Sequence, residues 1–193
     1  MENVTRGGVK MRAVSEMNIM VCKTGGAEIG EISEILKDIA DEYLKKKHID
    51  IHTQIFDSVK KMLFAMKDVL AHIIITDIEV GNEDVLQAIQ SMRNEGFQGK
   101  VVFFSTIKER VYESFKVNPF YYGVFSETPK VKKQEVIARC IDKIEEKRDE
   151  LLHIKLEEGY KTIDIAKLDY VSIRGKVMRF VGEGIDENVA GIK

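Results

Sequence analysis

The side chains that could do chemistry lie directly after short apolar segments of this sequence. Lys23 follows residues 18–22, Asp77 follows an isoleucine-rich run, and Ser105 follows residues 101–104. If these segments are neighbouring parallel strands, their carboxyl ends meet at one edge of a sheet, where binding sites form. An ammonium group beside a carboxylate favours the charged form of both groups. The residue types therefore place a lysine, a carboxylate and a hydroxyl at the strand ends where function is expected in such a sheet.

The elements that must position these residues alternate between the period of a strand and that of a helix. Apolar runs predict strands at residues 18–22, 49–56, 73–78, 101–104 and 121–125. Apolar residues spaced three and four apart predict helices at residues 31–47, 59–66, 83–95, 107–117 and 131–152. Because helices connect the strands, the sheet is expected to be parallel. The predicted fold is α/β and flavodoxin-like, with a five-stranded parallel sheet of order 2-1-3-4-5.

After residue 152 the pattern changes to short strands separated by turn signals. Strands are predicted at residues 154–156, 162–165, 168–173 and 177–181. So few strands form a small β-rich fragment, which is marginal alone and needs a partner surface. Residues 184–193 are weakly apolar, and we expect them to form a frayed tail.

The composition of the 193-residue chain argues against several classes of protein. Its 30 Lys and Arg residues and 32 Asp and Glu residues leave a net charge of −2, which does not mark a nucleic-acid or membrane binder. No apolar run approaches the roughly 18 to 20 residues of a membrane span, and the N-terminal residues do not read as a secretory signal. Cys22 and Cys140 lie far apart, and no histidine or cysteine spacing indicates a metal site. We therefore expect a cytoplasmic protein with reduced thiols, no membrane association and no metal.

In their order and spacing, these segments resemble the LytTR class of bacterial response regulators, in which a receiver domain precedes a β-rich DNA-binding domain. The run I-I-I-T-D-I-E-V resembles the phosphoacceptor strand of that class and places Asp77 on the phosphoacceptor position. Ser105, in V-V-F-F-S-T-I-K-E-R, falls on the hydroxyl that rotates toward the phosphoryl group, and Tyr122 on the aromatic residue that reports this switch. The run I-D-I-A-K-L-D-Y-V-S-I-R-G resembles the opening strands of the LytTR domain. The resemblance implies a CheY-like receiver followed by a LytTR-like unit.

The same resemblance shows that parts of the phosphorylation site are missing. A working receiver holds Mg²⁺ with two further carboxylates after its first strand, and those positions are Lys23 and Thr24 here. The lysine that ends the fifth strand in the family corresponds to Phe125, and Lys130 lies past the strand. Mg²⁺ takes oxygen ligands, and a lysine repels it. We therefore expect no cofactor and no ready binding of Mg²⁺.

Three interpretations of this altered pocket follow. In the first, the Lys23 ammonium replaces the metal, pairs with Asp77 and holds the receiver in one state without phosphorylation. In the second, Lys23 points to solvent and Asp77 has no remaining function. In the third, weak phosphorylation persists with the help of Glu28 and Glu79.

The β-rich part is shorter than a LytTR domain, so the resemblance implies that the later strands and DNA-contacting loops are absent. Arg174, Lys176 and Arg179 lie near one turn and are the candidates for contacts with DNA phosphates. Basic and acidic residues are equal in number from residue 151 onward, so we expect direct DNA binding to be weak.

These observations divide the chain into segments and leave two signalling hypotheses. The segments are a flexible N-terminal extension (1–16), a receiver-like domain (17–130), a long last helix and linker (131–152), a truncated LytTR-like β unit (153–183) and the tail (184–193). The first hypothesis is a non-enzymatic transcription regulator with a degenerate receiver, which acts through protein contacts. It would pair with itself through its fourth and fifth helices, with a sensor histidine kinase, or with a complete response regulator. The alternative is a phosphorylated LytTR-type response regulator that binds DNA directly; no nucleophile–base pair or cofactor motif favours an enzyme.

Overall fold

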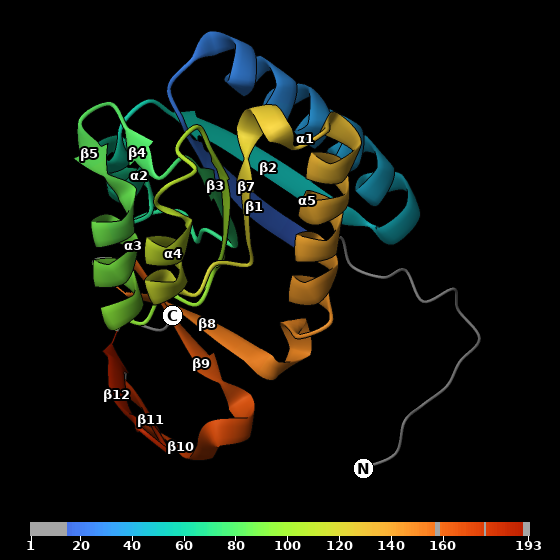
Figure 1. Ribbon diagram of the computed structural model, residues 1–193. Helices are drawn as coiled ribbons and strands as arrows, with labels where there is room; N and C mark the ends of the chain where they lie inside the picture. Colours follow the sequence, from blue (N-terminus) through green and yellow to red (C-terminus); the bar gives the residue numbers. More distant parts are fainter. Residues whose placement is uncertain (1–14, 157–158, 176, 191–193) are drawn as a thin grey trace.

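A central parallel sheet organises the larger part of the chain (Figure 1). The computed structural model describes residues 15–156, 159–175 and 177–190. The strands of this sheet are β1 (Ser15–Cys22), β2 (Ile49–Phe56), β3 (Ile73–Thr76), β6 (Lys100–Ser105) and β7 (Tyr121–Val124). They lie in the order β2-β1-β3-β6-β7, and each neighbouring pair is parallel. Both the predicted flavodoxin-like fold and the predicted strand order are confirmed.

Helices cover both faces of this sheet. They are α1 (Gly26–Lys47), α2 (Val59–Ala65), α3 (Val85–Asn94), α4 (Val111–Ser114) and α5 (Lys130–Glu145). Side chains alternate along a strand, so Ile19 and Val21 of β1 join the core beneath α1 and α5. Met20 and Cys22 join the core beneath α2 and α3 on the opposite face. Two apolar layers therefore hold the carboxyl ends of the strands in place.

Short elements connect the larger ones. They are β4 (Glu79–Val80), β5 (Glu83–Asp84), and the 3-10 turns η1 (Phe115–Val117), η2 (Phe125–Glu127), η3 (Arg148–Glu150) and η4 (Ile165–Lys167). The predicted helix over residues 107–117 is wrong in its extent, because only α4 and η1 are helical there. Strand β1 begins at Ser15, so residues 15 and 16 belong to the sheet and not to the predicted N-terminal extension. Residues 1–14 lie outside the described part.

The last helix is shorter than predicted. It ends at Glu145 rather than residue 152, and β8 (Leu151–Leu156) begins soon afterwards. Residues from Leu151 pair in antiparallel register with β9 (Gly159–Asp164), which the helical spacing of the sequence could not reveal. Antiparallel pairing with the strand that follows directly in the chain thus overrides the local helical pattern.

The C-terminal unit, β8 to β12, is built from two small antiparallel sheets. The second sheet contains β10 (Leu168–Arg174), β11 (Val177–Gly182) and β12 (Ile185–Ala190) in that order. The frayed tail predicted for residues 184–193 is wrong as far as residue 190, because β12 pairs along β11; residues 191–193 lie outside the described part. The buried residues of the two sheets form one small core: Ile154, Ile163, Phe180 and Val189.

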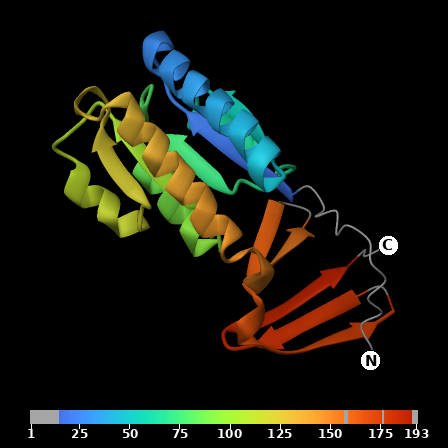
Figure 2. The same cartoon turned by 90° about the vertical axis from the view of Figure 1, so that its right-hand side faces the viewer.

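The C-terminal unit lies against the amino-terminal ends of the central strands (Figures 1 and 2). The Tyr160 hydroxyl donates to the Asp68 carbonyl oxygen at 3.1 Å, and the Lys155 ammonium lies 3.6 Å from the Asp68 carboxylate. Arg148 donates to the carbonyl oxygen of Glu16 at 3.1 Å. Within the described residues, no helix has the length and apolar character needed to cross a bilayer.

Candidate functional site

Asp77 follows β3 at the carboxyl edge of the sheet and is 5% exposed. Its Oδ1 accepts hydrogen bonds from the Ser105 hydroxyl at 2.5 Å and from the Ile78 N–H at 2.6 Å. Its Oδ2 accepts from the Thr106 N–H and the Thr106 hydroxyl, both at 3.1 Å. Both carboxylate oxygens are therefore already engaged by protein donors.

Lys23 continues from β1 into the same pocket and is completely buried. Its Nζ donates to the Phe104 carbonyl oxygen at 2.7 Å and to Asp77 Oδ2 at 3.3 Å. It also lies 2.8 Å from Oε2 of Glu28, in the first turn of α1. Of the three N–H donors of this ammonium group, two make hydrogen bonds, and Glu28 Oε2 contributes its negative charge without accepting a hydrogen bond. The pocket thus supplies the partners that a buried charge requires.

The charge of Asp77 is set by opposing effects. Burial raises its pKa, but hydrogen bonding from Ser105, the positive charge of Lys23 and the N–H groups of Thr106 and Ile78 outweigh it. The net pKa lies below the ordinary carboxyl value of 3.8. Asp77 is therefore ionised at neutral pH and forms an ion pair with Lys23.

Phe125 and Tyr122 lie at the end of β7 beside this pair. The buried ring of Phe125 lies 5.2 Å from the Lys23 ammonium and 3.5 Å from that of Lys133. Such contacts are favourable, because the ring face carries negative potential. The Tyr122 hydroxyl donates to the carbonyl oxygen of Ile107, in the loop that follows Ser105. Both aromatic residues thus contact groups that border the Asp77 pocket.

Other polar residues near these strand ends are exposed or pair with other side chains. Thr24 is exposed. Glu79 pairs with Arg110 at 2.8 Å, and Lys130 pairs with Glu34 at 2.8 Å. Among the predicted pocket residues, the structure brings Lys23, Ser105 and Phe125 near Asp77 and leaves Thr24 in solvent.

Sequence reasoning missed Lys133, a second buried cation near the site. It is 2% exposed, lies in α5 and pairs with Glu31 of α1 at 3.0 Å. The signal was present in the sequence, because Lys133 is in helical phase with the core residues Val136, Ile137 and Cys140.

Two of the candidate DNA-contacting residues, Arg174 and Arg179, share a face of the C-terminal sheet. Arg179 pairs in register with Ser172, and Arg174 with Val177, so both arginines project to one side. The guanidinium group of Arg179 donates two hydrogen bonds to the Asp186 carboxylate, both at 2.8 Å. This carboxylate neutralises the charge of Arg179. Arg174 is exposed, and Lys176 lies outside the described residues.

No protein-family model matches the sequence, and no curated protein matches it. Solved structures do resemble it. The response regulatory domain of protein mrkE from Klebsiella pneumoniae aligns over 67% of this chain and 99% of its own length, with a TM-score of 0.56 and 16% identity. The receiver domain of a modulated diguanylate cyclase from Desulfovibrio desulfuricans aligns over 67% and 97%, with a TM-score of 0.52 and 16% identity. The central sheet and its helices have the CheY-like receiver fold.

A third receiver structure allows a test of whether a metal fits this receiver fold. The receiver domain of a sensor histidine kinase from Pseudomonas aeruginosa has a magnesium ion coordinated in its active-site cleft; it has a TM-score of 0.52 and 9% identity and aligns over 66% of this chain and 99% of its own. In the present chain the Lys23 ammonium lies between Asp77 and Glu28. No group of three or more possible metal ligands occurs among the described residues. The oxygen-rich octahedral shell of Mg²⁺ does not fit a pocket that holds a buried ammonium.

Proposed function

We propose that this chain is a two-component-type signalling protein with a degenerate receiver that works without phosphorylation. The observation that carries the proposal is the buried Lys23 ammonium, 3.3 Å from Asp77 Oδ2. Phosphoryl transfer relies on metal ions that neutralise the developing charge, and it needs an attacking oxygen that can reach phosphorus. In this pocket a fixed cation already compensates the carboxylate, and protein donors hold both of its oxygens.

The same contacts support a receiver held in one state. Ser105 already bonds to Asp77 at 2.5 Å, where the family resemblance gives this hydroxyl a phosphoryl group as its partner. The Tyr122 hydroxyl is tied to the loop after Ser105 through Ile107. If the ion pair between Lys23 and Asp77 is always formed, the receiver has a single state. Phosphorylation then has no second conformation to select.

Intact mass spectrometry tests this proposal directly. The full chain is incubated with acetyl phosphate and Mg²⁺, with Asp77→Asn as the site control and a receiver that has the usual acidic pair as the donor control. We expect no phosphate adduct on this chain while the donor control is labelled. An adduct on the wild-type chain that disappears in Asp77→Asn would refute a phosphorylation-independent receiver.

The output of such a receiver is proposed to be a protein contact. Tyr112 of α4 and Phe115 of η1 are 80% and 63% exposed, and their rings meet edge to face at 6.2 Å. Exposed aromatic residues in contact are typical of association surfaces. We propose that this pair supports a homodimer or contact with a histidine kinase or complete response regulator. In this role the chain is a non-enzymatic regulator of transcription.

The alternative is a phosphorylated LytTR-type regulator that binds DNA directly. Exposed Arg174 is the feature that favours it, because the cation lies on one face of a small sheet. A chain with few phosphate contacts loses DNA as salt rises. Binding to random duplex DNA at physiological salt that Arg174→Ala weakens, together with an Asp77-dependent adduct, would favour this alternative.

A further inference from the structure

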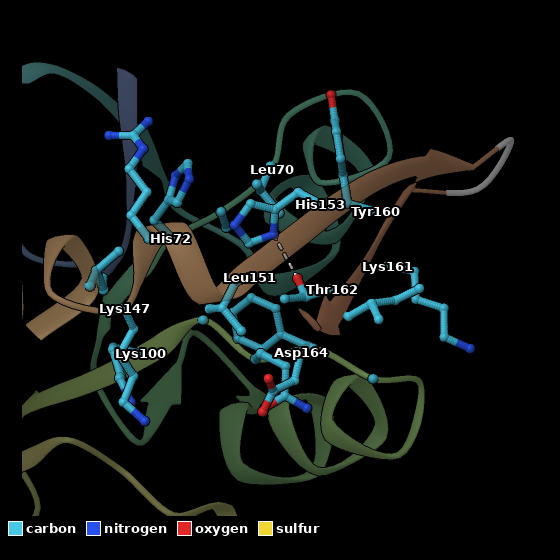
Figure 3. Close-up of a pocket in the computed structure, with 18 of the residues that line it drawn as sticks. Leu70, His72, Lys100, Lys147, Leu151, His153, Tyr160, Lys161, Thr162 and Asp164 are labelled. Atoms are coloured by element: carbon cyan, nitrogen blue, oxygen red, sulfur yellow. Dashed lines mark hydrogen bonds between the residues drawn. The ribbon is translucent and has the colours of Figure 1, made fainter. Parts of the chain in front are cut away.

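A cavity of about 460 Å³ lies at the opposite end of the sheet from Asp77, between the receiver fold and the C-terminal unit (Figure 3). The receiver contributes the start of β6, the segment before β3 and the end of α5. The C-terminal unit contributes β8, β9 and residues 183–185. Pockets for small molecules have volumes of roughly 300 to 1,000 Å³ and often form between domains. We call this space the junction cavity.

The junction cavity combines apolar and aromatic surface with a surplus of positive charge. Leu70, Phe97, Leu151 and Ile163 contribute apolar surface to its wall. More basic than acidic side chains line it, and the basic ones are Lys100, Lys143, Lys147, Arg148, Lys161 and Lys167. This combination suits a ligand with an apolar body and an anionic group.

Lys100 and Lys147 are the two cations best placed to bind an anion. Arg148 and Lys143 already pair with Glu145 and Glu146, at 2.6 and 2.5 Å. Lys100 and Lys147 have no carboxylate within ion-pair distance among the described residues, and Figure 3 shows both at one end of the cavity. A lysine presents three donors as a compact charge, which matches a phosphate or a carboxylate.

His72 adds a neutral donor to the same wall. Its Nδ1 accepts the Asn18 N–H at 3.0 Å, so the ring proton is on Nε2. Its ring meets that of His153 edge to face at 5.8 Å, and the Nδ1 of His153 lies 2.9 Å from the Thr162 hydroxyl. The two histidines therefore join the receiver to β8 beside the basic residues, as Figure 3 shows.

We propose that the junction cavity binds a small organic anion that has an apolar or planar body and one phosphate or carboxylate. Lys100 and Lys147 bind the anionic group, and the apolar wall around Phe97 and Leu151 receives the body of the ligand. Because its walls come from both units, the bound ligand stabilises their contact and gives the chain an input that bypasses Asp77. The inference does not rest on the state of the phosphoacceptor pocket.

The test is a titration of the isotope-labelled full chain, followed by amide chemical shifts. Adenosine monophosphate and octanoate are the two probes, and they separate a nucleotide from an acyl carboxylate as the source of the anion. We expect at least one probe to give saturable shifts at amides of the cavity, such as those of Gly99 and Thr162. Loss of two charge-assisted bonds in Lys100→Ala/Lys147→Ala is expected to weaken binding by at least about tenfold.

Lys37→Ala removes one cation at an exposed position on α1; it is the surface-charge control and is expected to bind the probe as the wild type does. The proposal is overturned if neither probe saturates, or if the double variant binds as tightly as the wild type. It is also overturned if the probe binds outside the cavity, at the exposed Ile173 of β10. In that case the largest shifts lie around Ile173, and Ile173→Ser removes them. An unchanged amide spectrum of the free variants shows that they are folded. A phosphate adduct on Asp77 would refute the proposed function and leave this result unaffected.

Discussion

Replacing Lys23 by methionine isolates the contribution of the buried ammonium group. Methionine has a similar length and is apolar, so the volume stays filled while the charge and its hydrogen bonds are lost. Asp77 and Glu28 then face each other without the cation that lies 3.3 and 2.8 Å from them. Removal of one partner of a buried pair costs about 3 to 5 kcal/mol, because it leaves an uncompensated charge.

The structure favours the lower end of this range. Asp77 retains its hydrogen bonds from Ser105, Thr106 and Ile78. The Glu28 side chain is 25% exposed, so water can reach part of its carboxylate in the variant, although the Oε2 atom that faces Lys23 is buried. We expect a loss of about 3 kcal/mol, a large part of the stability of an ordinary domain. At about 2 kcal/mol per molar urea, the unfolding midpoint falls by about 1.5 M.

Urea unfolding followed by circular dichroism measures this loss, with Lys37→Met as the control at an exposed helical position. The double variant Lys23→Met/Asp77→Asn is expected to recover part of the loss, because the neutral amide no longer needs a cation. A Lys23→Met variant within about 0.5 kcal/mol of the wild type would refute the reasoning, since a solvated surface lysine behaves that way.

The pH dependence of this difference has a definite sign. The folded pKa of Asp77 is depressed in the wild type, so its contribution is present above the ordinary value of 3.8 and is lost as pH falls through the folded pKa. In Lys23→Met the lost cation lets burial raise that pKa. We therefore expect the gap between variant and wild type to shrink from pH 8 to pH 5. A gap that widens on acidification contradicts the ion pair.

Three further predictions concern other parts of the molecule. Phe180→Ala, in the small C-terminal core, is expected to lower the free energy of unfolding of that unit by about 3 to 5 kcal/mol. We expect it to abolish amide-exchange protection in β10 to β12 but not in β1. An equal loss of protection in β1 and in β10 to β12 would contradict a separate core. Tyr112→Ser/Phe115→Ser is expected to leave the free energy of unfolding unchanged, because both side chains are exposed. Light scattering is expected to show a dimer for the wild type and a monomer for the variant. A variant that still forms dimers would place the interface elsewhere. Burial beside His153 and Arg148 lowers the pKa of His72 to about 4 from 6.5, so stability falls as pH drops from 6.5 to 4. His72→Gln is expected to flatten that slope, and an equal slope in both proteins would exclude His72 as its source.

Local patterns determined the receiver fold and much of its site. Apolar runs of strand length, separated by amphipathic helices, allow few topologies other than a parallel sheet covered on both faces. Asp77, Ser105 and Lys23 each follow such a run, so the parallel arrangement brings them to one edge. The meeting of these residues at one edge can be predicted from the periodicity of the side chains and the parallel direction of the strands alone.

Tertiary structure decided which partners these residues have. Glu28 reaches Lys23 because α1 begins just after Gly25, whose φ of 101° is readily available only to glycine. Lys133 reaches Phe125 through the packing of α5 beside α1. Such contacts join residues that are distant in sequence, and no local pattern encodes their distances.

In the C-terminal unit, too, some features follow from the sequence and others only from the tertiary structure. The sequence by itself determined that short strands and turns follow the last helix, because alternation and glycine positions are local signals. It did not determine that α5 ends at Glu145 or that residues 185–190 form β12. Those outcomes depend on backbone pairing with β9 and β11 and on a shared core around Phe180. Strand pairing is cooperative and depends on the partner strand and the core that it packs on, so only the folded chain decides where a weak strand begins and ends.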